Sequence, residues 1–302
     1  MQRSIDRYQS ELDDFKFAPT CPTITQIMSE PELIEILPGF DGWIIGDDPA
    51  TEAVFRAGVD GRLKAAVKWG VGIDNVDIDG AERHGLKVAN TPGMFGEEVA
   101  DVAMGYLIAL ARQTFAVDTG VRSGEWPKPL GVSLRDKVVG IVGLGNIGTA
   151  FAKRTAVAGM RVIGYDPRGE LSEDLIPYVT QLDWPVGIEN ADFIVLCCAL
   201  NRSTRQLLND QILHACKRGV RIVNVSRGSL VDETALAAHL ETGHVHSAAL
   251  EVFETEPLPL DSPLRQFAQC LFGSHNASNT REAVDRTSRL ALRLLRDQLL
   301  AS

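Results

Sequence analysis

The sequence predicts an α/β protein of two domains, and three observations lead to that class. The chain has 302 residues, and at about 100–200 residues per domain this length favours two domains that each bury a core. Short apolar runs alternate with helical patterns, which is typical of parallel sheets covered by helices. The alternation is interrupted by the polar segment 113–137, restarts at residue 138 and runs to about Phe253.

The elements expected before the interruption are short strands and helices in alternation. They are, in order, a helix carrying Ile5, Tyr8, Leu12 and Phe15 at helical spacing, a strand within 17–24, a helix at 31–37, a strand at 42–46, a helix at 49–57 and a strand at 63–69. A long helix at 97–112 follows, with acidic residues at its start and Arg112 at its end, as the helix dipole favours. The segment 113–137 is expected to be an irregular arm, lid or domain boundary.

The last helix is expected from about Arg281 and has a basic and an apolar face. These faces are formed by Arg286, Arg289, Arg293 and Arg296 and by Val284, Ala291, Leu295 and Leu299, respectively. The basic face is interpreted as solvated rather than as a nucleic-acid patch, because 30 Lys and Arg against 40 Asp and Glu give the chain a net charge of −10.

Composition argues against several partners and sites. Nucleic acids and anionic membranes need concentrated positive charge, so neither is expected as a partner. The longest apolar stretch, 99–111, contains Asp101 and is shorter than the ~20 residues of a membrane span. The chain begins without the apolar core of a secretory signal, and its five cysteines lack metal-ligand spacing. His239, His244 and His246 lack a fitting set of further ligands. We therefore expect a cytoplasmic protein with reduced thiols and no metal.

Residues 138–166 predict a dinucleotide site. A buried strand at 138–142 leads into Gly143-x-Gly145-x-x-Gly148, and a helix and a second strand follow. Gly143 permits a tight turn, Gly145 lets a pyrophosphate approach the backbone, and Gly148 allows close packing of helix on strand. Asn146 and Ile147 complete the helix N-terminus, whose N–H groups and dipole attract phosphates.

The second strand of this segment ends at Asp166, 18 residues after Gly148. A carboxylate there accepts hydrogen bonds from a ribose 2′-hydroxyl and repels a 2′-phosphate, so NAD is favoured over NADP. Arg168 could partly offset that repulsion, but we interpret it as a solvent-facing loop arginine.

Further blocks occur in a fixed order along the chain. They are GVGIDNVD (70–77), ANTPG (89–93), VGIVGLGNIG (139–148), NVSRGSLVDETAL (224–236), ALEVFETEP (249–257) and GSHNASNT (273–280). Together they resemble the D-isomer-specific 2-hydroxyacid dehydrogenase family, which includes D-3-phosphoglycerate dehydrogenase. The resemblance covers about residues 40–300.

The resemblance implies two α/β domains with a cleft between them. A flavodoxin-like substrate domain would comprise residues 1–104 and 282–302, and a Rossmann-type NAD-binding domain residues 105–281. The helix at 97–112 would cross between them, and the helix and arm at 97–135 would form a homodimer. The family's first domain opens with a strand, whereas this chain opens with a helix, so we expect the substrate domain to lack its first strand.

By the same resemblance, Arg227, Glu256 and His275 are the catalytic set. An imidazole titrates near neutrality, so His275 can protonate the carbonyl oxygen of a 2-oxo acid during hydride transfer. Glu256 would favour imidazolium and orient the ring. Arg227 would bind the substrate carboxylate and polarise the carbonyl.

The resemblance also implies substrate and cofactor contacts. The backbone N–H groups of Val71 and Gly72 would hold the substrate carboxylate, and Lys68 would line the pocket. Glu251 would lie by the nicotinamide carboxamide, although the family usually has Asp there. Two further departures are Gly273-Ser274-His275 in place of Thr-Pro-His and Cys197-Cys198-Ala199 in place of His-x-Pro.

The expected function is therefore NAD-dependent hydride transfer to or from a small D-2-hydroxy acid. 3-Phosphoglycerate, glycerate/hydroxypyruvate and glyoxylate remain open as substrate types. The alternative is an NAD(H)-sensing, corepressor-like scaffold with little turnover, since corepressors of this family retain the same residues. A formate dehydrogenase is disfavoured, because that branch has Gln where this chain has Glu256.

Overall fold

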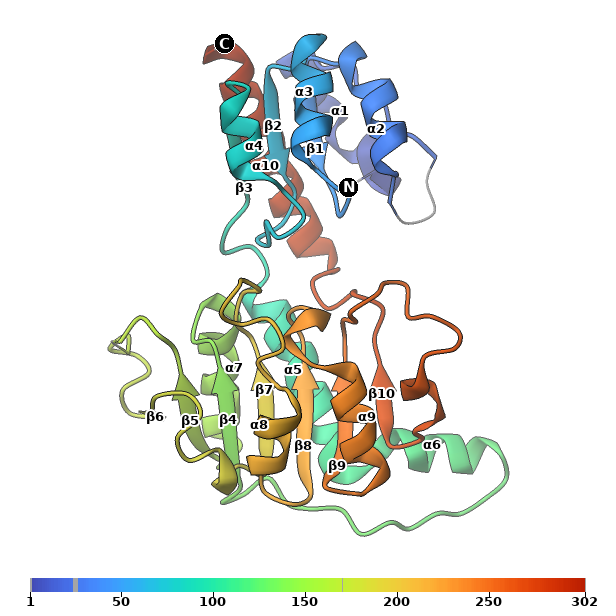
Figure 1. Ribbon diagram of the computed structural model, residues 1–302, viewed down its shortest axis with the longest axis vertical. Coiled ribbons are helices and arrows are strands. Elements are labelled where there is room, and N and C mark those ends of the chain that lie inside the picture. The colour runs from blue at the N-terminus through green and yellow to red at the C-terminus, as the bar shows by residue number, and fades with distance from the viewer. Residues whose placement is uncertain (1, 24–26, 170, 302) are drawn as a thin grey trace. The chain divides into compact units, whose positions relative to one another are not determined.

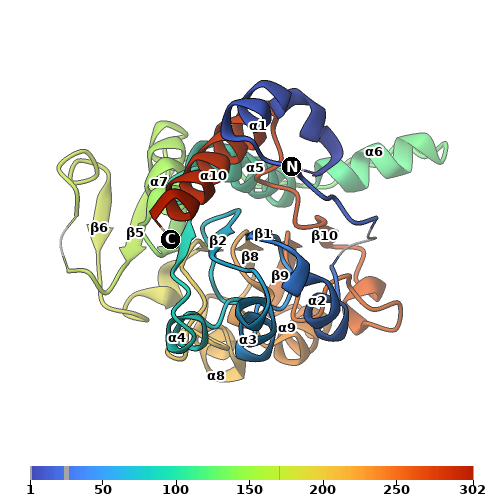
Figure 2. The ribbon, with the colours of Figure 1, turned by 90° about the horizontal axis from the view of Figure 1, so that it is seen from above.

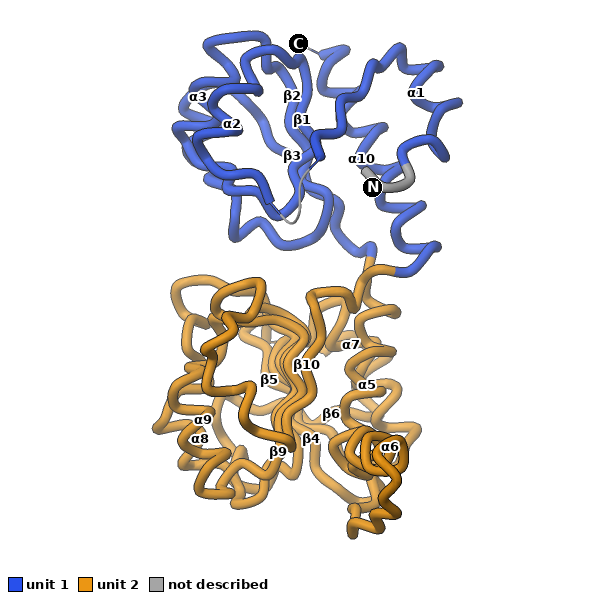
Figure 3. Tube along the Cα trace, turned by 90° about the vertical axis from the view of Figure 1, so that its right-hand side faces the viewer, with its two compact units in different colours: residues 1–94, 280–302 blue, residues 95–279 orange. Residues whose placement is uncertain are grey.

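The structure is a computed structural model that describes residues 2–23, 27–169 and 171–301. It divides into two compact units, unit 1 with residues 1–94 and 280–302 and unit 2 with residues 95–279 (Figures 1 and 3). Helix α5 (Gly96–Arg112) lies wholly within unit 2. This division falls at residue 94, whereas the predicted boundary is at residue 104, and the predicted domain bounds stay a prediction.

Unit 1 is built on a small parallel sheet. Its strands are β1 (Gly42–Ile45), β2 (Ala65–Lys68) and β3 (Val88–Asn90), which pair in that order within the described residues. One face is covered by α2 (Glu30–Ile36), α3 (Glu52–Asp60) and α4 (Ile78–Arg83), and a one-turn helix η2 (Leu37–Gly39) follows α2. Apolar residues such as Leu33, Phe55 and Ala81 form the core on this side.

The other face of this sheet is covered by the two ends of the unit's sequence. These are η1 (Gln2–Tyr8), α1 (Gln9–Phe15) and the long helix α10 (Arg281–Ala301) (Figure 2). Ala291 and Leu295 of α10 pack on Ala65 and Val67 of β2, and Leu292 packs on Tyr8 and Leu12.

The basic residues of α10 are not simply solvated, so that interpretation is wrong for part of the face. The Arg289 guanidinium lies over the Tyr8 ring at 5.6 Å and pairs with Glu11. The Arg296 guanidinium lies over the Phe15 ring at 4.6 Å. These arginines lie against aromatic rings of η1 and α1 while remaining partly exposed, which a charge count does not reveal.

The strand expected within 17–24 is absent from residues 17–23, and residue 24 lies outside the described residues. Lys16 ends α1 in the left-handed conformation, and the Phe17 N–H bonds back to the Leu12 carbonyl. Phe17 then packs its side chain into the unit 1 core rather than pairing its backbone.

Unit 2 contains, in the described part of the chain, a seven-stranded parallel sheet of order β10-β9-β8-β7-β4-β5-β6. Its strands are β4 (Val138–Val142), β5 (Arg161–Tyr165), β6 (Val179–Gln181), β7 (Phe193–Leu196), β8 (Val220–Asn224), β9 (Val245–Leu250) and β10 (Cys270–Phe272). β4, β7 and β8 are buried along their whole length, as expected for strands covered on both faces.

Helices cover both faces of this sheet (Figures 1 and 3). One side has α5 and α7 (Asn146–Val157), which pack on each other, and the other has α8 (Asp210–Ala215) and α9 (Glu233–Glu241). Single turns η3 (Ile188–Asn190), η4 (Gly228–Leu230) and η5 (Pro263–Gln266) complete the unit. The strand order reverses between β4 and β7, which creates a topological switch point at the carboxyl edge.

The segment 113–137 is less irregular than predicted. Gln113 takes the left-handed conformation and ends α5, and a new helix α6 (Thr114–Arg122) begins directly after it. Asp118 and Arg122 pair one turn apart at 2.8 Å and support this helix. Residues 125–133 then run without helix or strand.

Candidate active site

The glycine-rich turn joins β4 to α7 at the switch point. Gly143 has φ +90°, and a Cβ there would meet the backbone of Cys198 at the end of β7 at 2.6–2.7 Å. A Cβ on Gly148 would overlap the Gly143 carbonyl oxygen. Both glycines are therefore needed for the turn itself, because a side chain at Gly143 would collide with the backbone after β7 and one at Gly148 would push α7 away from the turn.

Gly145 differs from its two neighbours in the motif. It has the ordinary extended φ of −70°, and a Cβ there would meet nothing within 4 Å. This residue therefore borders open space at the N-terminus of a 12-residue helix, where the first N–H groups have no partner inside the helix. The residues fit a dinucleotide, since the pyrophosphate would occupy that space and accept from N–H groups at Asn146 and Ile147.

Asp166 follows β5 and is bound on both oxygens. The Leu144 N–H donates to Oδ2 at 2.8 Å, while the Arg168 N–H and Nε donate to Oδ1 at 3.0 and 2.8 Å. The Arg168 hydrogen bonds are the main cause that lowers the pKa of Asp166 to about 2. Arg168 faces solvent, as expected, with 66% of its side chain exposed, but it is also an ion-pair partner of the predicted ribose carboxylate, which was not predicted.

The three predicted catalytic residues follow three neighbouring strands at the carboxyl edge of the sheet. Arg227 comes after β8, Glu256 after β9 and His275 after β10. The segments after β8 and β9 pack closely on each other, because a Cβ on Gly228 would overlap the backbone of Phe253.

Glu256 and His275 form a direct pair. The His275 Nδ1 lies 2.7 Å from Glu256 Oε2, and the Phe253 N–H donates to Oε1 at 3.0 Å. Both side chains are about one-quarter to one-third exposed. A carboxylate at Nδ1 orients the ring and directs Nε2 away from Glu256, and proton transfer from Nε2 to a substrate oxygen stays a prediction.

Arg227 is fixed by its turn. Asn224, a buried residue at the end of β8, donates from Nδ2 to the Arg227 carbonyl at 2.8 Å and accepts from the Ser226 N–H at 3.1 Å. The Arg227 Nη1 donates to the Ser226 carbonyl at 2.8 Å. The common action of Arg227 and His275 on one substrate stays a prediction.

Glu251 directly follows β9 and is 3% exposed. Its carboxylate accepts from the Tyr106 hydroxyl and from the N–H groups of Asn276 and Ala277, the latter at 2.9 Å. Its predicted contact with a nicotinamide carboxamide stays a prediction.

The predicted substrate loop lies in unit 1, after β2. The Gly70 N–H donates to the buried Thr91 hydroxyl at 2.8 Å, and Asn90 Nδ2 donates to the Val71 carbonyl at 3.0 Å. Val71 itself is 47% exposed. Residues of the ANTPG block thus hold the substrate loop by hydrogen bonds to its backbone. The contact of Val71 and Gly72 with a carboxylate stays a prediction.

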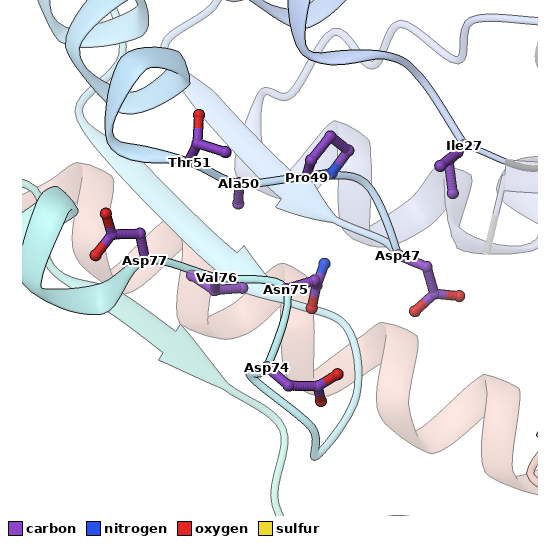
Figure 4. A pocket seen from close by; sticks show the side chains of 9 residues that line it. All are labelled: Ile27, Asp47, Pro49, Ala50, Thr51, Asp74, Asn75, Val76 and Asp77. Atoms are coloured by element: carbon purple, nitrogen blue, oxygen red, sulfur yellow. The ribbon is translucent and has the colours of Figure 1, made fainter. Parts of the chain in front are cut away.

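A hollow in unit 1 adjoins this loop at the carboxyl ends of β1 and β2 (Figure 4). Its lining residues are Ile27, Asp47, Pro49, Ala50, Thr51, Asp74, Asn75, Val76 and Asp77. Asn75 ties the two loops together, because its Nδ2 donates to the carbonyls of Gly46 at 3.1 Å and Asp48 at 2.7 Å. The described lining residues include no lysine or arginine.

Lys68 is 3% exposed at the end of β2. Its Nζ donates to the Gly46 carbonyl and lies 3.2 Å from Asp47 Oδ1. The adjacent Trp69 donates to the Ser288 hydroxyl at 3.1 Å and packs in the unit 1 core.

Other predicted features are peripheral to this chemistry. Within residues 2–23, 27–169 and 171–301, no group of His, Cys, Asp and Glu has an arrangement that could hold a metal ion, and no helix is long and apolar enough to cross a membrane. His239 contacts Asp210 at 2.9 Å. Burial raises the pKa of Cys198 to about 11 and that of Cys216 to about 12, so these thiols stay protonated.

Sequence reasoning missed three residues that shape the site. Asn224 and Asn75 stood inside the quoted blocks, and a polar residue beside a buried strand end is a signal that could have found them. Tyr106 gave no such signal, because a tyrosine in a long apolar helix is normally interpreted as a core residue. Only the structure shows that its hydroxyl donates to Glu251.

A parallel sheet with a glycine turn at its switch point, a ribose-type carboxylate one strand away and an imidazole–carboxylate pair at the same edge defines a nicotinamide-dependent dehydrogenase. Comparison with known proteins narrows this class. The family described as D-isomer specific 2-hydroxyacid dehydrogenase, NAD binding domain, matches residues 104–277. The chain belongs to the D-isomer-specific 2-hydroxyacid dehydrogenase family, and the prediction of NAD as cofactor is confirmed.

Among its relatives, hydroxypyruvate reductase of Thermotoga maritima is 36% identical over 79% of this chain and 77% of its own. D-3-phosphoglycerate dehydrogenase of Sus scrofa is 37% identical over 86% of this chain, which spans 49% of that protein. The solved structure of the TT0316 protein from Thermus thermophilus is 30% identical, with a TM-score of 0.88 over 98% of this chain and 94% of that one. The predicted fold class and enzyme class are confirmed, and the corepressor alternative receives no support.

Proposed function

We propose that this protein transfers hydride between NAD(H) and a short, unphosphorylated 2-oxo or D-2-hydroxy acid, of the hydroxypyruvate or glyoxylate type. The observation that carries the proposal is the 2.7 Å pair between His275 Nδ1 and Glu256 Oε2, held at the strand edge that also bears Arg227 and the dinucleotide turn. That arrangement supplies a proton donor, its orienting carboxylate and a cation for a carboxylate substrate.

The bound nicotinamide supplies the hydride acceptor or donor. His275 delivers the proton to the carbonyl oxygen in reduction and removes it in oxidation, using Nε2 while Glu256 holds Nδ1. Glu256 also stabilises the imidazolium by its charge. Arg227 binds and polarises the 2-oxo acid, and the Asn224 clamp keeps its turn in place.

The charges of unit 1 support an unphosphorylated substrate. Asp47 and Asp74 line the hollow beside the predicted substrate loop, and the Lys68 ammonium is already bound to Asp47 and the Gly46 carbonyl. A phosphate dianion placed there would face these two carboxylates, which costs free energy by Coulomb repulsion. The name of the Thermotoga maritima relative, hydroxypyruvate reductase, agrees with this choice.

A steady-state panel tests the proposal. We expect NADH oxidation with hydroxypyruvate and glyoxylate, and a kcat/KM for phosphohydroxypyruvate at least about tenfold lower, which corresponds to ~1.4 kcal/mol. NADPH is included as the second cofactor. No turnover with any of these acids would refute the enzyme assignment, whereas a preference for phosphohydroxypyruvate would refute the substrate choice alone.

Assembly and location form part of the same proposal. Phe115, Trp126 and Leu130 in the segment 97–135 are 54, 76 and 96% exposed, which supports burial of this arm in a homodimer. The cysteines within the described residues are all unpaired, which supports work in the reducing cytoplasm.

A further inference from the structure

Glu251 binds the backbone of the catalytic histidine and of the two residues that follow it. The His275 N–H donates to the Glu251 carbonyl at 2.9 Å. The next two N–H groups, at Asn276 and Ala277, donate to the Glu251 carboxylate Oε1. Three consecutive N–H groups of the loop are therefore bound to one buried residue at the end of β9.

This support matters because His275 has a left-handed backbone with φ +55°. Residues other than glycine rarely adopt that conformation, and surrounding contacts must hold it in place. The same conformation sets the direction of the imidazole toward Glu256. A loosened loop would therefore misplace the ring that carries the proton.

Gly273 provides the space that Glu251 occupies. A Cβ on Gly273 would overlap Glu251 Oε2 and lie 2.5 Å from the Tyr106 hydroxyl. The φ of Gly273 is not positive, so space rather than backbone freedom requires glycine. These are two of the positions where the chain departs from the Asp and Thr of the family's blocks, and the structure shows that the two departures lie in contact.

Tyr106 closes the other side of the carboxylate. Its hydroxyl donates to Glu251 Oε2 from α5. Burial and the Glu251 carboxylate raise the pKa of this phenol well above its ordinary value, so Tyr106 is a donor at any working pH. Both oxygens of Glu251 are thus committed to protein donors.

We propose that Glu251, accommodated by Gly273 and held by Tyr106, is a positioning residue that fixes His275 through the backbone of residues 275–277. This role does not depend on the predicted contact with the nicotinamide carboxamide, which the first test below distinguishes from it. The effect on catalysis rests on the proposed function, whereas the coupling of Glu251 with Gly273 does not.

The first test is Glu251→Asp, which shortens the side chain to the length usual in the family. Loss of the loop contacts should lower kcat by ~10–100-fold through misplacement of the ring, while the Kd of NADH, measured by fluorescence titration, changes by less than about threefold. Glu241→Asp, at the exposed end of α9, is the matched control. An unchanged kcat with an altered Kd of NADH would overturn the proposal in favour of a cofactor contact.

The second test needs no turnover. Gly273→Ala should lower the urea midpoint strongly in the native background, or prevent folding, and should do far less in the Tyr106→Phe/Glu251→Asp background, where the obstructing atoms are gone. Gly105→Ala, on an open face of α5, is the control. An equal loss of stability in both backgrounds would overturn the coupling. A wild-type chain that reduces no 2-oxo acid, with the coupling intact, would contradict only the proposed function.

Discussion

Asp166 lies at the tip of β5 with both carboxylate oxygens bound, one of them by the Leu144 N–H of the glycine turn. This bond joins the two parts of the sequence that were predicted to hold the dinucleotide. The remaining bonds come from Arg168. We therefore expect the preference between NADH and NADPH to depend on this pair rather than on one carboxylate.

Asp166→Ala should weaken NADH binding by roughly 10–100-fold, because a hydrogen bond to a charged group contributes about 1.5–3 kcal/mol. NADPH binding should change less, since its 2′-phosphate gains nothing from the carboxylate. Fluorescence titration with both cofactors measures this. Equal loss for NADH and NADPH would indicate that Asp166 supports the turn and does not read the ribose.

Arg168→Ala tests the ion pair through pH. Arg168 holds the pKa of Asp166 at about 2, below the ordinary 3.8, so the pair's contribution to stability is present above pH 3.8 and is lost as the pH falls toward 2. The Arg168 side chain is 66% exposed, and we expect a loss of less than ~1 kcal/mol at pH 7. Urea unfolding at pH 7, 4 and 3, with Arg202→Ala as an exposed control, should show the difference narrowing below pH 4. A difference that grows in acid would contradict this account.

The role of a residue could be predicted from the sequence where it depends on the chemistry of that side chain alone. Glu256 and His275 were predicted to pair, and the structure gives their contact. Tyr106 and Gly273 could not be predicted, because their roles depend on a long-range approach between α5, the end of β9 and the loop after β10. The partnership of Arg168 with Asp166 was missed because composition treats a loop arginine as solvated.

At the scale of secondary-structure elements, the three glycines of the turn between β4 and α7 have different roles. Gly143 and Gly148 are needed by the turn, whereas Gly145 faces open space and has an ordinary φ.

Gly145→Ala and Gly148→Ala should therefore separate binding from stability. Gly145→Ala should leave the melting temperature nearly unchanged while it blocks NADH, because its methyl group occupies the space of the pyrophosphate. Gly148→Ala should lower both the melting temperature and the NADH affinity, with a loss of unfolding free energy of about 1–3 kcal/mol, which is typical of overpacking. Calorimetry and NADH titration measure the two effects. A lower melting temperature of Gly145→Ala would contradict the conclusion that Gly145 borders open space.

Elements with strong periodicity were predicted well, and the exceptions have local causes. The strands and helices of the dinucleotide segment lie where their apolar runs indicate. Helix α6 was not predicted because its glycine and polar residues resemble those of a loop. The strand expected after α1 does not form, because Phe17 packs its side chain into the core and does not pair its backbone with a strand. The contacts of Arg289 with the Tyr8 ring of η1 and of Arg296 with the Phe15 ring of α1 could not be predicted from the sequence of α10 alone.

At the scale of the whole molecule, the exposed apolar residues of the arm need a partner surface. Trp126→Asp together with Leu130→Asp should convert the expected homodimer to a monomer, since charges would be buried at the interface. Light scattering after size exclusion gives the mass directly. Wild-type protein that elutes as a monomer at micromolar concentration would contradict the proposed assembly.

For the molecule as a whole, we propose that the chain is a 2-oxo acid reductase in which His275 supplies the proton. The most direct measurement is the kcat of NADH oxidation with hydroxypyruvate for wild type and His275→Ala, beside NADH titrations of both. We expect the substitution to lower kcat by ~10²–10⁴-fold and to leave the NADH affinity unchanged. Turnover of His275→Ala equal to that of wild type would contradict it.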